Sequence, residues 1–395
     1  MEDAIAPAVR LSDIAPFRVM EILARARELE RGGRSVIHME IGEPDFPTPQ
    51  PICEAGVAAL AKGEVFYTPA LGLPALREAI AGFYRTRYGV DVPASRIIVT
   101  TGSSGALLLA VSALVDPGDR VLVSDPGYPC NRHFVRLVEG EPVSVAVGAD
   151  SNYQLTPELI EQHWDSRTVA ALVASPSNPT GTLIPVGHLK TMSDITRARG
   201  GTLVVDEIYH GLVYESEVTT ALALSEDVFV INSFSKYFNM TGWRLGWMVV
   251  PERYVSELDK LAQNIFLAAP TPAQHAALAA FTPETLAILE ARRAEFQARR
   301  DYLVPALRAL GFDIPQSPQG AFYIYAGCSR LTRDSFAFAR DLLEEAGVAI
   351  TPGIDFGSNA PEQHVRFAYT NSIARLQEGV RRIDAFLHVH KRVPA

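Results

Sequence analysis

The sequence predicts an α/β protein with a mostly parallel, seven-stranded sheet that is covered by helices on both faces. Seven short apolar runs between Arg96 and Val250 carry this prediction, and helical patterns separate most of them. Each run has four to six residues, is rich in β-branched side chains and lacks a clear polar alternation. This pattern is typical of strands that are buried on both faces of a parallel sheet. The runs are residues 97–100, 121–124, 143–147, 169–174, 203–206, 228–232 and 245–250.

A second, smaller α+β domain is predicted from the change of pattern after Pro251, where long helical segments replace the strand–helix alternation. A chain of 395 residues exceeds one small core, so a large domain with a smaller one is the expected organisation. We place an N-terminal arm and part of the small domain at residues 1–46, the large ligand-binding domain at 47–282 and the small C-terminal domain at 283–395.

The N-terminal segment is predicted to form a helix, a short strand and a crossing loop. The helix has an apolar face over Met20–Leu29 and ends at Gly32-Gly33, and the apolar run Val36–Ile41 is the strand. The proline-rich segment Gly42–Pro49 can form neither a helix nor a central strand, so we expect it to cross between the domains. Gly42 would let the backbone approach another group closely.

The remaining elements follow from the same patterns. Pro74 is suited to the first turn of a helix. Beyond Pro251, apolar residues at helical spacing are interrupted by two short strands. The expected segments are helices at residues 254–268, 272–280, 283–310 and from about 372 onward, and strands at 321–325 and 365–369.

Composition excludes several classes of protein. Hydrophobic residues make up 48% of the chain and charged residues 21%, which is ordinary for a globular protein. The net charge of -9 argues against a general nucleic-acid surface. The three cysteines are odd in number and widely spaced, which favours a reducing compartment over disulfides or a zinc site. The N-terminus lacks a signal-peptide pattern, and no apolar run approaches the ~18 residues of a membrane span. We therefore expect a soluble cytoplasmic protein with neither metal, membrane nor nucleic acid as a partner.

Lys236 is the most informative single residue. It follows the sixth apolar run and is flanked by Phe234, Tyr237 and Phe238, in a chain that contains five lysines. Burial lowers the pKa of a lysine, and a neutral amine can attack a carbonyl to form a Schiff base. An ordinary turn with an outward-pointing lysine is the alternative interpretation.

Polar residues also follow the other predicted strands, where ligands of parallel sheets bind. Gly102, Ser103 and Ser104 open a helix after the first strand, and free amides at the positive end of a helix dipole favour an anion. A simple serine cap is the alternative. Tyr128 follows the second strand in a rigid turn, where its ring could stack on a flat cofactor or pack at the surface.

The later strands end in further polar groups. Asn178 follows the fourth strand, and Asp206 ends the fifth, with Tyr209 three residues on. An acid at the end of an apolar strand is desolvated, and such a charge is rarely kept without a partner. Ser233 and Arg244 follow the sixth strand together with the lysine.

Together these residues offer a phosphate cradle, a stacking ring, a carboxylate, two hydrogen-bond donors and a desolvated amine. A flat heteroaromatic aldehyde with a basic ring nitrogen and a phosphate requires this set of groups. Each residue has an ordinary structural explanation when it is taken alone. Their common position at successive strand ends favours one shared site.

Over nearly its full length, the chain resembles the class I aminotransferases, which are pyridoxal-phosphate enzymes of fold type I. The lysine motif with an arginine eight residues later is highly specific for that family, whereas the glycine–serine loop alone is not. The motifs are GEPDFPTP at Gly42–Pro49, SPSNPTGT at Ser175–Thr182, DEIYHGL at Asp206–Leu212, SFSKYFNMTGWRLGW at Ser233–Trp247, GAFYIY at Gly320–Tyr325 and VRFAYT at Val365–Thr370.

The resemblance implies the chemistry of the site. Lys236 would form the internal aldimine and then carry the proton between the substrate Cα and the cofactor. Asp206 would keep the ring nitrogen protonated, which makes the ring an electron sink. Asn178 and Tyr209 would hold the phenolate oxygen. The implied reaction is transamination between an L-amino acid and a 2-oxo acid through ping-pong half-reactions.

The resemblance also implies binding residues and a partner. Arg366 would grip the substrate α-carboxylate in bidentate fashion, with Gly42 and Asn178 beside it. Tyr67 would reach the phosphate of a neighbouring subunit, which implies a homodimer with shared sites. The residues implied to bind the cofactor are Tyr67, Gly102, Ser103, Ser104, Tyr128, Asn178, Asp206, Tyr209, Ser233, Lys236 and Arg244.

One departure from the family pattern bears on the substrate. The closest bacterial aspartate aminotransferases have a lysine that serves the distal carboxylate where this chain has Ser104. A dicarboxylic preference is therefore in doubt unless another basic residue substitutes, and the physiological donor and acceptor stay open. Phe17 is a candidate wall of the site, with a core position as an equal alternative.

Three rival functions were weighed. A pyridoxal-phosphate-dependent C–S β-lyase for cystathionine-like substrates shares the fold and the lysine, but the DEIYHGL motif is closer to transaminases. A cofactor-sensing regulator would need a DNA-binding domain before Gly42. A dinucleotide oxidoreductase would need a GxGxxG motif after an early strand.

Overall fold

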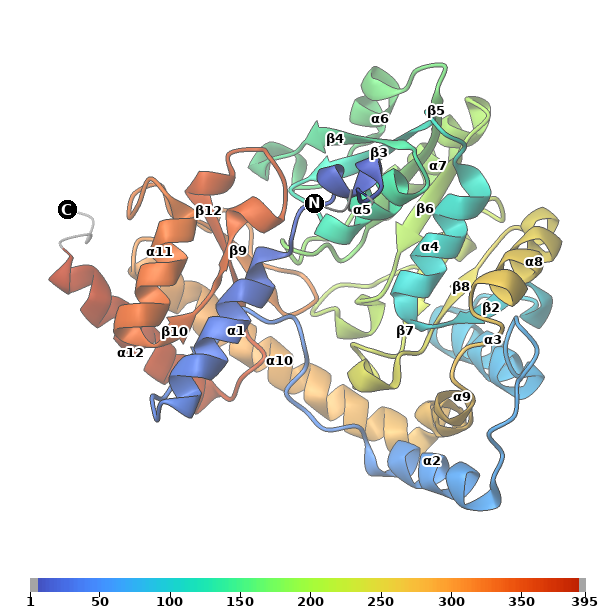
Figure 1. Ribbon diagram of the computed structural model, residues 1–395, viewed down its shortest axis with the longest axis horizontal. Helices are drawn as coiled ribbons and strands as arrows, with labels where there is room; N and C mark the ends of the chain where they lie inside the picture. The colour runs from blue at the N-terminus through green and yellow to red at the C-terminus, as the bar shows by residue number, and fades with distance from the viewer. Residues whose placement is uncertain (1–5, 391–395) are drawn as a thin grey trace, which may run out of the picture.

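The computed structural model of the protein describes residues 6–390 (Figure 1). Its largest sheet has seven strands in the order β2-β8-β7-β6-β5-β3-β4. The strands are β2 (Ile97–Thr100), β3 (Arg120–Asp125), β4 (Glu141–Ala146), β5 (Thr168–Ala174), β6 (Thr202–Asp206), β7 (Phe229–Ser233) and β8 (Gly246–Val249). The predicted fold class is confirmed.

Strand β8 is the exception to the parallel arrangement. Strands β3 to β7 pair in parallel, whereas β8 pairs antiparallel with both β2 and β7. An antiparallel neighbour can be reached by a loop without a crossover helix. Residues 234–245, which connect β7 to β8, therefore leave and re-enter the sheet at the same edge. This connection carries both Lys236 and Arg244.

Helices cover both faces of this sheet, and successive strand residues pack against opposite layers. Val121 and Val123 of β3 belong to one apolar cluster, and Leu122 belongs to the other. This two-sided burial explains why the strand runs lack polar alternation. The helices are α3 (Pro74–Tyr88), α4 (Gly102–Leu114), α5 (Pro129–Leu137), α6 (Pro157–His163), α7 (Val186–Ala198) and α8 (Val255–Ile265).

The N-terminal and C-terminal segments come together beside the large sheet (Figure 1). Strand β1 (Ile37–His38) pairs in parallel with β10 (Val348–Ala349), and β12 (His364–Ala368) lies between β11 (Thr351–Pro352) and β9 (Tyr323–Gly327). The flanking helices are α1 (Arg18–Arg31), α11 (Ser335–Asp341) and α12 (Ile373–Val389).

Three further helices lie between the seven-stranded sheet and the terminal segments or, in the view of Figure 1, below them. The long helix α10 (Pro283–Ala309) runs from the C-terminal segments toward α2 (Gln50–Lys62) and α9 (Thr271–Ala277), which lie together (Figure 1). The predicted division at residues 46 and 282 stays a prediction, and its outermost parts, residues 1–5 and 391–395, lie outside the described residues.

Some elements differ from the sequence-based prediction. The strand expected over Val36–Ile41 is limited to Ile37–His38, and the carbonyl oxygens of Glu40 and Ile41 accept hydrogen bonds from side chains. Helix α2 was not predicted, although it begins directly after Pro49. Helix α11 was also missed. Within residues 6–390, no helix combines the length and apolarity that a membrane crossing requires.

Candidate active site

A cavity of about 270 Å³ opens at the carboxyl edge of the large sheet, between it and the N- and C-terminal segments. Its walls come from the ends of β3, β5, β6 and β7, from the start of α4 and from residues of the N- and C-terminal segments. The predicted site residues that line it are Gly42, Ser103, Ser104, Tyr128, Asn178, Asp206, Tyr209, Lys236, Arg244 and Arg366, and Phe17 lies there as well.

Lys236 lies half-buried in this cavity just beyond the end of β7. Its Nζ donates a hydrogen bond to the carbonyl oxygen of Gly42 at 2.6 Å. Burial lowers the pKa of the amine to about 8, and the nearby Glu43 carboxylate partly offsets this effect. A substantial fraction of the amine is therefore neutral near pH 8, which is the form that reacts as a nucleophile or base.

Asp206 ends β6 and is buried with few partners. The backbone N–H of Ile208 donates to its Oδ1 at 3.0 Å. Burial raises the pKa of the carboxyl group to about 7, and the charge of Lys236 acts in the opposite direction. A cation placed against this carboxylate would lower the pKa again, so the side chain is poised to accept a positively charged partner.

Glu207, which the sequence analysis did not single out, lies next to this carboxylate. It is completely buried, and it accepts hydrogen bonds from the backbone N–H of Ala221 at 2.7 Å and from Thr220 Oγ1 at 2.8 Å. Burial raises its pKa to about 8. These bonds fasten the turn after β6, which also carries Tyr209.

Arg366 is held rigidly on β12 and is 2% exposed. Its Nη1 donates to Asn178 Oδ1 at 2.9 Å, and its Nη2 donates to the carbonyl oxygen of Glu40 at 2.6 Å. The guanidinium carbon lies 4.3 Å from the ring centre of Tyr323. The buried Nε has no hydrogen-bond partner within the described residues. The side chain is therefore oriented before any ligand arrives, and it keeps donor capacity.

Tyr323 is a second residue that the sequence analysis missed, although its motif was noted. Its hydroxyl lies 2.9 Å from the hydroxyl of Tyr209. A Cβ atom on Gly42 would meet the Tyr323 hydroxyl at 2.0 Å, so glycine is required for this close approach. The group that the Gly42 backbone approaches closely is thus the Tyr323 hydroxyl of the protein itself.

The start of α4 and Arg244 form one concave surface. Gly102 has a φ of +72°, and a Cβ atom there would meet Arg244 Nη2 at 2.8 Å. Arg244 itself has a φ of 53°, and its Nη1 donates to the carbonyl oxygen of Thr241 at 3.0 Å. A non-glycine residue in the left-handed region costs free energy, and such strain concentrates at functional sites. The arrangement brings a guanidinium to the positive end of a helix dipole.

Three predicted residues do not line the cavity. Gly102 lies against Arg244, as just described. Ser233 donates its hydroxyl to Ser235 Oγ at 3.0 Å, and Ser235 lines the cavity in its place. The predicted anion contact therefore fits Ser235 better than Ser233. Tyr67 is 83% exposed and lies on the outer surface.

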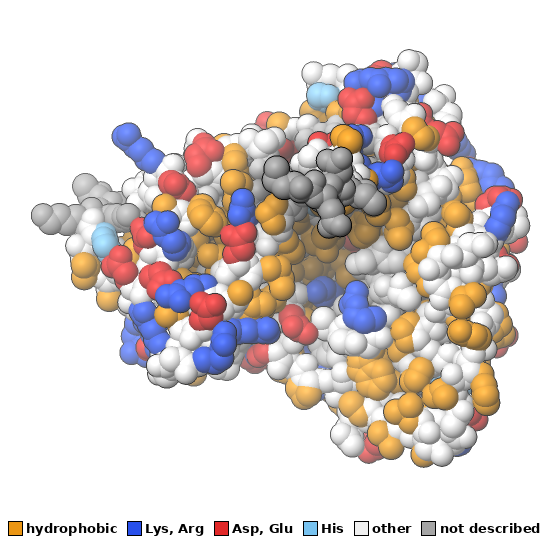
Figure 2. All heavy atoms as spheres, in the orientation of Figure 1, with side chains coloured by type: hydrophobic (Ala, Val, Ile, Leu, Met, Phe, Trp, Pro, Cys, Tyr) orange, Lys and Arg blue, Asp and Glu red, His pale blue; other side chains and the backbone are white. Residues whose placement is uncertain are grey.

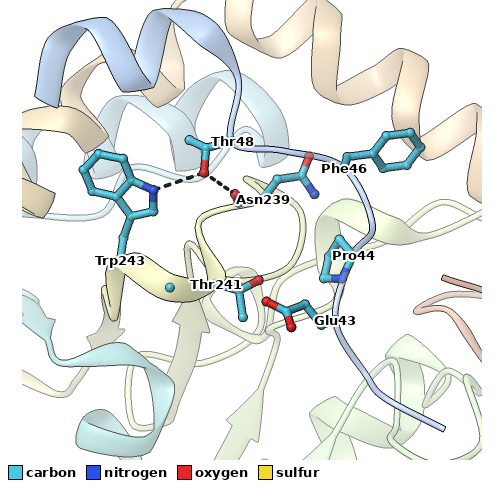
Figure 3. Close-up of a pocket in the computed structure, with 8 residues that line it drawn as sticks. Glu43, Pro44, Phe46, Thr48, Asn239, Thr241 and Trp243 are labelled. Atoms are coloured by element: carbon cyan, nitrogen blue, oxygen red, sulfur yellow. Dashed lines mark hydrogen bonds between the residues drawn. The ribbon is translucent and has the colours of Figure 1, made fainter. Parts of the chain in front are cut away.

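A second cavity of about 380 Å³ adjoins the first one (Figure 3). Glu43 and Thr241 line both cavities. Figure 3 shows the Thr48 hydroxyl between two neighbours: Trp243 Nε1 donates to it at 3.0 Å, and it donates to the carbonyl oxygen of Asn239 at 2.8 Å. These bonds fasten the crossing segment after Gly42 to the loop that carries Lys236.

Comparisons with known proteins agree with this geometry. Residues 34–383 match the family model described as aminotransferase class I and II. The chain is 39% identical over 376 residues to a valine–pyruvate aminotransferase of Mycobacterium tuberculosis, covering 95% of this chain and 97% of that protein. It is 35% identical over 382 residues to an aspartate aminotransferase of Thermotoga maritima, covering 96% and 98%.

Solved structures show the same likeness. A crystal structure of an aminotransferase from Mycobacterium tuberculosis superposes with a TM-score of 0.94 at 38% identity, covering 98% of this chain and 100% of the other. The aspartate aminotransferase of Thermus thermophilus with maleate gives a TM-score of 0.91 at 34% identity, covering 97% and 100%.

Proposed function

The chain belongs to the class I and II aminotransferase family, and from this membership we propose which residues perform its pyridoxal-phosphate-dependent transamination. The family assignment covers the reaction and the cofactor. The roles of single residues, the substrate class and the assembly are our proposals. The observation that carries them is the half-buried amine of Lys236, whose pKa is lowered to about 8, opposite the buried carboxylate of Asp206.

The residues around the cavity fit pyridoxal phosphate. The start of α4, with Arg244 beside it, suits the phosphate, and Ser103, Ser104 and Ser235 add donors. Asp206 would hold a proton at the ring nitrogen, since its desolvated carboxylate lacks a cationic hydrogen-bond partner among residues 6–390. Tyr128 would pack against the ring, and Tyr209 would donate to the phenolate oxygen.

Bound pyridoxal phosphate supplies an electron sink that stabilises negative charge at the substrate Cα. Lys236 Nζ would take the proton from the substrate Cα, and it would return a proton in the opposite half-reaction. An amine with a pKa near the working pH suits both directions of this transfer.

The substrate α-carboxylate would bind to Arg366. The planar guanidinium matches a carboxylate in bidentate geometry, and its bond to Asn178 Oδ1 leaves the asparagine Nδ2 as a further donor. The Gly42 segment would close the other side, since its carbonyl oxygen already contacts Lys236.

The preferred amino donor would be a monocarboxylic or aromatic amino acid, whose side chain has no carboxylate. Phe17, Val19 and Met20 give the cavity an apolar wall, and Ser104 adds no charge to it. A relative named valine–pyruvate aminotransferase supports this class. Glutamate and 2-oxoglutarate would serve as the shared pair.

The decisive experiment is chemical trapping. Borohydride reduction of the yellow holoenzyme should fix the cofactor on Lys236, and peptide mapping should find the label there. A label on Lys62, Lys190 or Lys260 would refute the assignment. Single-turnover loss of the absorbance band with a panel of amino donors would then rank alanine, valine, phenylalanine and aspartate.

The assembly we propose is a cytoplasmic homodimer with shared sites. Figure 2 shows apolar side chains gathered over the region of α2 and α9, where Tyr67 and its neighbour Phe66 are 83% and 80% exposed. Val57 and Leu60 of α2 are exposed by 65% and 58%. An exposed apolar patch of this kind suits a second copy of the chain. The unpaired cysteines support a reducing compartment.

A further inference from the structure

A smaller cavity of about 140 Å³ lies directly behind the apolar wall of the active site. Phe17, which is half-buried, lines both cavities and separates them. The smaller cavity is bounded by the segment before α1, by the first turn of α5 and by residues 354–355. It therefore adjoins the place where the substrate side chain would lie.

Arg132 on α5 supplies a positive charge to this smaller cavity. The side chain is half-buried, and its Nη2 donates to the backbone carbonyl oxygen of Asp355 at 2.9 Å. Within residues 6–390, no carboxylate oxygen lies within 4.0 Å of its guanidinium, although most arginines of the chain have such a partner. A desolvated cation without an anion is unfavourable, so the cavity favours an anionic guest.

Two carboxylates, Asp125 and Asp355, act on this charge at longer range, and each of them is already bonded to other donors. Asp355 accepts the backbone N–H of Arg18 through Oδ1 and that of Val19 through Oδ2, both at 2.8 Å. These two bonds cap the start of α1 and neutralise the carboxylate locally. Arg18, the other cation that lines the cavity, is paired with Glu21 at 2.7 Å. Arg132 thus remains the cation that is available to a guest.

We propose that Arg132 binds the distal carboxylate of a five-carbon dicarboxylic substrate, of the glutamate and 2-oxoglutarate class, when Phe17 turns aside and joins the two cavities. This inference rests on the proposed function, because it assumes that the α-carboxylate lies on Arg366. With Phe17 in its present position, the wall is apolar and suits the uncharged side chain of a monocarboxylic amino acid. One residue then lets the same site accept both kinds of substrate in its two half-reactions.

The dimensions are adequate for this guest. A volume of about 140 Å³ exceeds several times the ~30 Å³ that one water occupies in the liquid, so a carboxylate and a water fit. An arginine stays charged when it is desolvated and binds a carboxylate through two parallel hydrogen bonds.

The test compares substrates on the holoenzyme and the variant Arg132→Met, which keeps the length of the side chain and removes its charge. We expect kcat/KM for glutamate and 2-oxoglutarate to fall roughly 10- to 100-fold, the cost of hydrogen bonds to a charged group. Values for alanine and valine should stay within about twofold. Arg132→Lys should restore part of the glutamate activity. Arg136→Met is the matched control, because Arg136 lies on the same helix and pairs with Asp13 at the surface.

A binding measurement separates recognition from chemistry. Calorimetry with glutarate, a dicarboxylate without an amine, should give weaker binding to Arg132→Met than to the unchanged enzyme, and butyrate should bind both equally. The variant Phe17→Ala should increase the preference for glutamate over valine, and Arg132→Met should abolish that increase.

Several results would overturn the proposal. An equal loss for glutamate and valine would show that Arg132 only supports the start of α1. Unchanged glutamate activity in Arg132→Met, or valine activity without any glutamate activity in the unchanged enzyme, would also refute it. An unchanged enzyme that transaminates no amino acid at all would instead refute the proposed function.

Discussion

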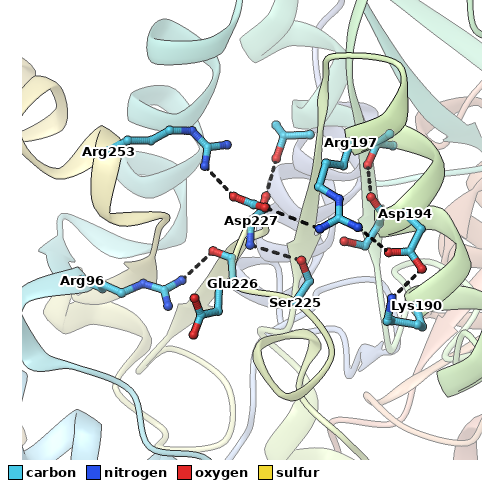
Figure 4. A network of polar contacts seen from close by, with 11 residues as sticks. Arg96, Lys190, Asp194, Arg197, Ser225, Glu226, Asp227 and Arg253 are labelled. Carbon is cyan, nitrogen blue, oxygen red and sulfur yellow. Dashed lines mark hydrogen bonds and ion pairs between the residues drawn. The ribbon is translucent and has the colours of Figure 1, made fainter.

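The two edges of the seven-stranded sheet hold their charged residues in different surroundings. At the amino edge, Asp227 precedes β7 and forms a surface network with neighbouring arginines (Figure 4). Its Oδ1 lies 2.5 Å from Arg253 Nη1, and its Oδ2 lies 4.0 Å from Arg197 Nη1. Figure 4 also shows Arg197 next to Asp194, which pairs with Lys190. Each of these five charged residues has a partner and contact with solvent.

At the carboxyl edge, the charged groups are desolvated and sparsely paired. Asp206 and Lys236 follow adjacent strands, each with a single hydrogen bond, and their pKa values are moved toward each other to about 7 and about 8. Paired surface charges contribute little to stability, whereas desolvated groups with shifted pKa values are available for chemistry. The same sheet therefore uses charge in two ways, and five predictions test this comparison.

The largest effect is expected at Lys236. Replacing it with Ala removes the base at the carboxyl edge and should lower the single-turnover rate by at least ~10²–10⁴-fold. Stopped-flow absorbance of the half-reaction with alanine measures it. Lys260→Ala is the control, because Lys260 is 66% exposed and pairs with Glu257. A rate for Lys236→Ala within tenfold of the unchanged enzyme would contradict the role.

The second-largest loss of activity is expected at Asp206. Asp206→Asn keeps the shape of the side chain but removes the charge that would hold a proton at the ring nitrogen. The cofactor should stay bound, and the rate of proton abstraction should fall by roughly 10²-fold. Absorbance spectra report cofactor content, and a deuterated Cα reports the proton step. Near-normal half-reaction rates would show that another residue fulfils this role.

In the apoenzyme, the same replacement of Asp206 by Asn should raise the stability of the fold, whereas it lowers the activity of the holoenzyme. The pKa of Asp206 is raised from 3.8 to about 7 by folding, so the folded chain holds this proton between pH 4 and 7 and the unfolded chain does not. Stability from this group is present at low pH and is lost as the pH rises through 7. Apo Asp206→Asn should therefore gain on the unchanged apoenzyme by on the order of 1.4 kcal/mol per pH unit over this range. Chemical unfolding at pH 4, 5.5 and 7 measures the difference, and a constant difference would refute it.

Tyr67 tests whether sites are shared between subunits. A lost hydrogen bond to a phosphate should cost about 1.5–3 kcal/mol of cofactor binding in Tyr67→Ala. A mixed dimer with Lys236→Ala would contain one site with both residues intact and should regain activity that neither parent has. Exchange of subunits is verified by mass-tagged chains. Activity equal to the plain average of the parents after proven exchange would place Tyr67 outside the partner's site.

The smallest effect is expected at the amino edge. Asp227→Asn breaks the pair with Arg253, and exposed ion pairs of this kind contribute about 0.2–1 kcal/mol. The free energy of unfolding should fall within that range, and kcat/KM should not change. Titration with urea and the alanine half-reaction provide the two readouts. A large loss of activity would mean that the two edges are coupled and that the comparison fails.

The sequence could predict the large sheet because each strand is a continuous apolar run that needs burial on both faces. It could also predict Lys236, Asp206 and Asn178 as a cluster, because parallel strands bring their carboxyl ends to one edge. Arg366 was reached through family resemblance alone, since its place depends on the pairing of β12 with β9.

Other residues could not be found from local patterns. Tyr323 enters the site through its contact with Tyr209, which is 114 residues away in the chain. Arg132 stands in an ordinary amphipathic helix, and its significance depends on how the carboxylates near it in space are already bonded. Helix α2 begins within a proline-rich stretch, and its residues contact α9, which lies far along the chain. Long-range packing decides each of these cases.

The antiparallel strand β8 has a mechanical consequence. Because residues 234–245 are anchored in adjacent strands at both ends, the amine of Lys236 and the guanidinium of Arg244 belong to one rigid frame. Arg366 belongs to a different frame, since β12 pairs with β9 and β11. If the two frames moved relative to each other about a hinge, the distance between the Lys236 amine and the Arg244 guanidinium would stay the same. The distance between the Lys236 amine and the Arg366 guanidinium would change. The residues that we propose to hold the cofactor and the residue that we propose to hold the amino acid thus belong to two separate structural units, so their spacing can be set independently.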